Sequence, residues 1–177
     1  MPSARTHDAV TFLLAAPAFG VTYLFTRNAG SSALVAAAFV FGGLMFGPDL
    51  DTVSRQYSRW SFLRVMWLPY RTFFKHRSRF THGLIFGAFL RVFYFCGVLT
   101  LVGFIAAYGY AAYSGGHAPG IEDIRHVWRP VADAITHLFG SNFYLLGFLG
   151  IWFGAASHTF TDMAGSFIKT GRVAKFL

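Results

Sequence analysis

Four long apolar segments constrain the fold of this chain more than any other feature of its sequence. They cover residues 9–26, 31–47, 84–113 and 142–162, and a helix that crosses a membrane needs about 20 mostly apolar residues. Charged residues make up only 12% of the chain, whereas a soluble domain carries about a quarter. The sequence therefore predicts an all-α, polytopic membrane protein with four transmembrane helices in a single domain covering residues 1–177.

The distribution of Lys and Arg predicts how these helices are oriented. Four spans place both termini and the segment between the second and third spans on one side of the membrane. That side holds twelve of the 15 basic residues, and the opposite side holds Arg27, Arg125 and Arg129. Because cytoplasmic segments carry the excess of Lys and Arg, we expect both termini to be cytoplasmic.

Two of the connecting segments are predicted to lie at the membrane surface. Residues 55–74 mix Arg with Tyr, Trp and Phe, which is typical of an interfacial segment on the cytoplasmic side. Residues 121–139 repeat apolar side chains at helical spacing, which predicts an amphipathic helix on the opposite side. Arg91 lies near one end of the third span, and we expect its long side chain to reach the headgroups.

Ionisable side chains gather at the predicted cytoplasmic ends of the four spans. The carboxylates and imidazoles found there are His7, Asp8, Asp49, Asp51, His76, His82, His158 and Asp162. A single Asp or His at a helix end is usually a cap or a solvated residue. Eight such residues at one end favour a functional site, because ionisable groups at membrane depth are costly.

The spacing of these residues is typical of ligands for divalent metals. His158 and Asp162 are four residues apart and share one face of a helix, and Asp49 and Asp51 present two oxygen donors after a Gly-Pro break. Imidazole and carboxylate without thiolate suit Zn²⁺, Mn²⁺ or Fe²⁺. Arg77, between His76 and His82, either stabilises a phosphate or oxyanion or is an ordinary cytoplasmic charge.

The ordered motifs also resemble a known family over residues 6 to 162. They are Thr6-His7, Pro48-Asp49-Leu50-Asp51, His76-Arg77-x3-Thr81-His82 and His158-x3-Asp162. This set resembles the bacterial membrane-bound metal-dependent hydrolases typified by the YdjM inner-membrane protein, and related uncharacterised metal-binding membrane proteins. The resemblance implies a bacterial inner-membrane location and functional roles for His7, Asp49, Asp51, His76, Arg77, His82, His158 and Asp162. Gly83 departs from the family, which often has Ser there.

These observations predict an integral membrane hydrolase that uses one or two divalent metal ions at its cytoplasmic face. The expected metal ligands are His7, Asp49, Asp51, His76, His82, His158 and Asp162, with Asp51 also a candidate general base and Arg77 a candidate anion-stabilising residue. We expect membrane lipid as the partner and a lipid or lipid-linked phosphoester as the substrate. The alternatives are a non-catalytic metal-binding protein (a carrier, sensor or assembly factor) and a structural membrane subunit. Nucleic-acid binding is disfavoured because the basic residues interleave with apolar spans.

Overall fold

The protein is helical throughout the part of the chain that the structure describes. The computed structural model describes residues 2–74, 83, 86–117 and 119–171. Its elements are α1 (Ala4–Thr26), α2 (Ala29–Met45), η1 (Pro48–Asp51), α3 (Arg55–Arg59), η2 (Ser61–Trp67), α4 (Leu68–Phe73), α6 (Phe86–Ser114), α7 (Ile121–Phe139) and α8 (Phe143–Thr170). The predicted all-α class is confirmed, and four helices are long and apolar enough to cross a membrane: α1, α2 continued through η1, α6 and α8.

The helix boundaries differ from the predicted spans at the end where the ionisable residues lie. Helix α1 begins at Ala4 rather than at residue 9, because the Ser3 side chain caps it by accepting a hydrogen bond from the Thr6 backbone N–H. Helix α8 continues to Thr170, past the predicted end at residue 162. His7, His158 and Asp162 are therefore held on regular helix rather than on loops.

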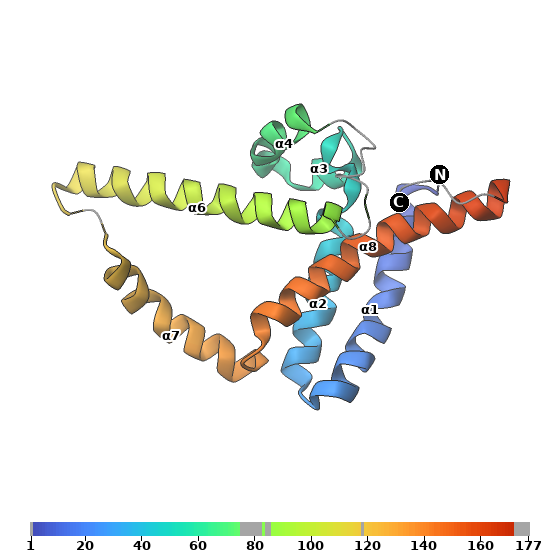
Figure 1. The fold of residues 1–177 in the computed structure, drawn as a ribbon, viewed down its shortest axis with the longest axis horizontal. Coiled ribbons are helices and arrows are strands. Elements are labelled where there is room, and N and C mark those ends of the chain that lie inside the picture. Colours follow the sequence, from blue (N-terminus) through green and yellow to red (C-terminus); the bar gives the residue numbers. More distant parts are fainter. Residues whose placement is uncertain (1, 75–82, 84–85, 118, 172–177) are drawn as a thin grey trace.

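Helices α2 and α8 form the centre of the bundle, and α1 packs alongside them (Figure 1). Their backbones approach each other at glycines. A Cβ atom at Gly150 would meet the carbonyl oxygen of Val35, and one at Gly154 would overlap that of Phe39. Small residues permit such close packing of membrane helices, and here they fix how α8 lies against α2.

Residues 55–74 form α3, η2 and α4, which enclose an aromatic cluster together with the ends of α2 and α6. The cluster consists of Phe46, Trp60, Trp67, Tyr70, Tyr94 and Phe95. Trp67 and Tyr70 are fully buried, whereas Phe62 and Phe73 are exposed. The larger aromatic side chains of this segment therefore pack against one another, and only some are placed to meet lipid headgroups.

Arg91 corrects one expectation from the sequence. Its side chain does not extend to the surface, because it is only 1% exposed. It lies close enough to Tyr70 and Asp51 for its charge to act on both. Burial raises the pKa of the Tyr70 hydroxyl, and the positive charge of Arg91 opposes that shift.

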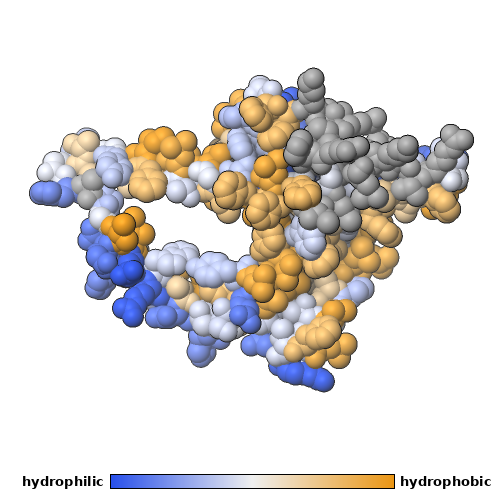
Figure 2. Space-filling view, viewed as in Figure 1, coloured by the Kyte–Doolittle hydropathy of each residue, from blue (hydrophilic) through white to orange (hydrophobic). Residues whose placement is uncertain are grey.

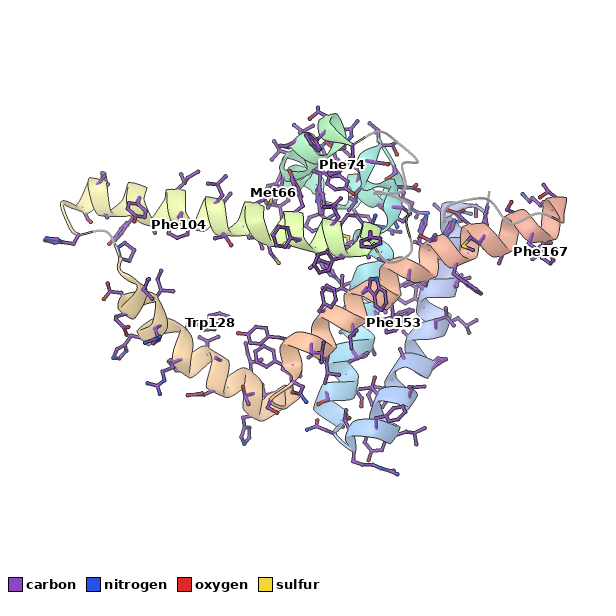
Figure 3. All side chains as sticks on the ribbon, viewed as in Figure 1. Met66, Phe74, Phe104, Trp128, Phe153 and Phe167 are labelled. Atoms are coloured by element: carbon purple, nitrogen blue, oxygen red, sulfur yellow. The ribbon has the colours of Figure 1, made fainter. Side chains whose placement is uncertain are left out.

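Helices α6 and α7 extend away from the bundle (Figure 1). The surface of α6 is mostly hydrophobic, whereas strongly hydrophilic residues gather along α7 (Figure 2). Trp128 of α7 is directed toward α8 (Figure 3), and its indole N–H donates a hydrogen bond of 3.2 Å to the Tyr144 hydroxyl. Helix α7 has the bounds that the sequence predicted, residues 121–139.

The packing of α8 on α2 yields a stability prediction. We expect Gly154→Ala to destabilise the protein by about 1–3 kcal/mol, because the added methyl group forces the two backbones apart. Gly147→Ala is the matched control on the same helix, since nothing lies within 4 Å of a Cβ there. Unfolding in detergent, followed by helical circular dichroism, measures both variants. Equal stability of the two would contradict the role assigned to Gly154.

Candidate metal centre

The start of α1, the end of α2 and the middle of α8 bring ionisable residues from distant parts of the sequence together. Gly47 and Pro48 end α2, and the chain enters η1, which carries Asp49. At the start of α1, Pro2 packs closely over Gly165 of α8. This contact places His7 of α1 beside His158 and Asp162 of α8.

His7, His158 and Asp162 form a buried group that could hold a metal ion. The carboxylate of Asp162 faces both imidazoles, with Oδ1 at 3.2 Å from His7 Nε2 and Oδ2 at 3.8 Å from His158 Nε2. The two rings stack with their centroids 3.8 Å apart and an interplanar angle of 11°. One ligand atom from each of the three residues lies within 4.8 Å of the other two.

These donors fit a divalent transition metal. Bonds of about 2.0–2.2 Å in a tetrahedral site separate neighbouring ligand atoms by roughly 3.3–3.6 Å, and the two distances to Asp162 bracket that range. All three residues are 5–6% exposed. Among the described residues, His7 Nδ1 has no hydrogen-bond partner, and Asp162 Oδ1 has only its 3.2 Å contact with His7 Nε2. A cation would compensate the buried carboxylate, which is otherwise costly to keep ionised.

Asp49 lies at the rim of this group. Its Oδ2 atom is 3.6 Å from His158 Nε2, and its side chain is 37% exposed. The Ser54 hydroxyl donates a 2.7 Å hydrogen bond to the Asp49 backbone carbonyl, which fixes the turn that carries the carboxylate. Asp49 is therefore placed as a fourth ligand or as an acceptor for a water molecule in the site.

Gln56 of α3 contacts His158 on the side of the ring that faces away from Asp162 and Asp49. Its Nε2 atom donates a hydrogen bond of 3.1 Å to the Gly43 carbonyl and lies 3.0 Å from His158 Nδ1. Because an amide nitrogen only donates, His158 Nδ1 accepts in this arrangement, and the neutral ring carries its proton on Nε2. A metal ion at Nε2 would require that proton to move to Nδ1, because a ligating His normally donates its other N–H. Gln56 Oε1, which has no hydrogen-bond partner among the described residues, could accept it once the amide group of Gln56 had turned over.

The remaining predicted site residues are placed differently or fall outside the described part of the chain. Asp51 is buried in η1, but it is not one of the three grouped residues, and its charge acts on Tyr70 and Arg91. His76, Arg77 and His82 lie outside the described residues. The structure therefore brings His7, Asp49, His158 and Asp162 together and places Asp51 beside Arg91.

The sequence placed Asp8 in the cluster without giving it a role, and it gave no indication that Arg55, Gln56 and Arg59 belong to the site. Asp8, Arg55 and Arg59 line the same cavity as His7 and Asp49. Arg55 and Arg59 were interpreted only as cytoplasmic and interfacial charges, although their four-residue spacing predicts a shared helix face. No pattern in the sequence indicated a role for Gln56, because its position between Gly43 and His158 depends on three elements that meet in space.

Comparison with known proteins supports metal binding. The family model described as uncharacterized metal-binding protein (DUF2227) matches residues 2–172. The chain belongs to this family. An uncharacterized protein of Aquifex aeolicus (strain VF5) is 35% identical over 57 residues, which are 32% of this chain and 40% of that protein. No solved structure matches the chain significantly. The family description says nothing of hydrolysis, so the resemblance to YdjM-like hydrolases stays a prediction.

The contact between Gln56 and His158 predicts how metal affinity depends on this side chain. We expect Gln56→Met to weaken metal binding about 10–100-fold, because His158 Nδ1–H would lose its acceptor. Gln56→Glu keeps an acceptor, so it should bind metal about ten times more tightly than Gln56→Met does. Competition with a chromophoric chelator in detergent measures the affinities. Equal affinities of the wild type and Gln56→Met would contradict this role.

Proposed function

We propose that this protein binds one divalent transition-metal ion between α1 and α8, with His7, His158 and Asp162 as ligands. The observation that carries the proposal is that donor atoms from two helices, far apart in sequence, lie within 4.8 Å of one another in a buried position. Membership of a family described as metal-binding supports it. Asp49 is the candidate for a fourth ligand.

The donor set narrows the choice of metal. Two imidazoles and one or two carboxylates favour Zn²⁺, Mn²⁺ or Fe²⁺ over softer ions. Cys96, the one cysteine in the chain, lies in α6 and does not belong to the grouped residues. His7 lies near the start of α1, whereas His158 lies near the middle of α8.

A hydrolase is the second candidate function, and the shape of the centre favours it. Catalytic metal sites have three protein ligands and leave a position open, and His7, His158 and Asp162 would form such a set. A cavity of about 100 Å³ adjoins them and is lined by Asp49, Arg55 and Arg59 among others. A divalent ion in such a site supplies an activated water and polarises the bond to be cleaved. Asp49 would accept a proton at its Oδ2 atom, a role that the sequence had suggested for Asp51. The excess of Lys and Arg in the segments on this side supports a location at the cytoplasmic face of the membrane.

Metal content tests the proposed function directly. We expect the protein, purified without a histidine tag, to contain about one equivalent of metal, as in three-ligand sites of this type. His158→Ala and Asp162→Asn should each remove most of it, because each deletes one of three ligands. His137→Ala is the matched control, since His137 is exposed on α7. Inductively coupled plasma mass spectrometry gives the stoichiometry. Unchanged metal content in His158→Ala would contradict the proposal.

A further inference from the structure

We infer that the cavity beside the metal centre binds a phosphate group through Arg55 and Arg59 when the metal is present. The inference rests on the metal binding proposed above, and it deepens that proposal by naming the class of ligand. A terminal phosphate, in free form or on a lipid headgroup, has the chemistry that this cavity recognises.

Two guanidinium groups converge on one anionic oxygen in the structure. Arg59 Nη2 donates a hydrogen bond of 2.6 Å to Asp8 Oδ2, and Arg55 Nη1 lies 3.8 Å from the same oxygen. The second arm of Arg59 donates to the Leu44 carbonyl at 3.0 Å, which holds this guanidinium in place. The carboxylate of Asp8 thus marks a position between the two Arg residues where an anionic oxygen is stable.

This anion position is continuous with the metal centre. Asp8, Arg55 and Arg59 line one cavity together with His7, Asp49 and His158. Its volume is about 100 Å³, which is room for a group of a few heavy atoms, since a water molecule takes about 30 Å³. Arg side chains match the geometry of phosphate oxygens, and several of their N–H groups can bond at once.

The charges around the cavity make phosphate binding depend on the metal. The carboxylates of Asp8, Asp49 and Asp162 outnumber the guanidinium groups of Arg55 and Arg59 by one. Without metal, the cavity therefore repels a phosphate dianion. A divalent cation reverses the sign of the net charge, and the anion would then lie between the metal and Arg55.

Asp8 acts as an internal competitor for the same site. It is only partly buried, with a side chain 22% exposed, and Arg55 is more open still at 54%. Both side chains have room to turn when a phosphate enters, whereas Arg59 is held through Leu44. A phosphate oxygen would take the place of Asp8 Oδ2 on Arg59 and gain Arg55 as a second partner.

The test uses Mn²⁺-loaded protein in detergent, with inorganic phosphate as the probe. Bound Mn²⁺ is paramagnetic, so it increases the ³¹P relaxation rate of phosphate that binds beside it. We expect a saturable increase in the wild type, and about tenfold weaker phosphate binding in Arg55→Ala, which loses one charge-assisted hydrogen bond. Asp8→Asn should bind phosphate more tightly, because the competing charge is gone. Arg64→Ala, an exposed Arg of η2 outside the cavity, is the matched control.

The outcomes separate this inference from the proposed metal site. Protein that binds Mn²⁺ but leaves ³¹P relaxation unchanged would overturn the phosphate site and leave the metal site standing. Equal phosphate affinity in Arg55→Ala and the wild type would also overturn it. Failure to bind Mn²⁺, Zn²⁺ or Fe²⁺ at all would remove the basis of both proposals.

A second arm of the experiment identifies the source of the phosphate. Wild-type protein in nanodiscs of phosphatidylcholine is compared with protein in nanodiscs that also contain phosphatidic acid, whose headgroup is a terminal phosphate. If phosphatidic acid displaces inorganic phosphate from the Mn²⁺-loaded protein, the ligand is a lipid headgroup. If inorganic phosphate binds equally well in both nanodiscs, the ligand is a soluble phosphate.

Discussion

The close approach of α2 and α8 determines where the candidate metal ligands lie. Gly150 and Gly154 let the α8 backbone lie close to Val35, Ala38 and Phe39 of α2. Gly43 makes the corresponding room for Thr11 of α1. Because three helices are packed together in this way, the start of α1 and the end of α2 meet the middle of α8. His158 and Asp162 of α8 are then held against His7 of α1, and η1 follows directly from the end of α2.

The cost of burying ionisable groups explains why a cation belongs at that point. Asp162 is nearly inaccessible to solvent, and its two oxygens face two stacked imidazoles. Without metal, a proton on His158 Nε2 lies toward Asp162 and Asp49, and the amide of Gln56 favours that tautomer. A divalent ion at Nε2 would shift this proton to Nδ1 and compensate the carboxylates. The same ion would change the sign of the charge in the adjoining cavity, so metal binding and anion binding are coupled by electrostatics.

The sequence predicted the four spans and the convergence of His7, Asp49, His158 and Asp162, because apolar length and helical spacing are local properties. The sequence was a poorer guide to the positions of Asp51, Arg91 and Gln56, because these depend on three-dimensional packing. In a 3₁₀ turn there are three residues per turn, so Asp49 and Asp51 do not share a face: Asp49 is partly exposed and lies 3.6 Å from His158, whereas Asp51 is buried. Arg91 lies near the start of α6, yet it is only 1% exposed and lies beside Tyr70. The role of Gln56 follows from a contact across 102 positions in sequence, which no local pattern contains.

X-ray absorption spectroscopy of the zinc-loaded protein tests whether α1 and α8 bind one metal ion between them. We expect only nitrogen and oxygen ligands around the zinc ion, at about 2.0–2.2 Å, with the scattering pattern of two imidazoles. In His7→Gln the contribution of one imidazole should disappear, because α1 and α8 bind the same ion. A sulfur ligand, or a spectrum unchanged by His7→Gln, would contradict a metal site shared by the two helices.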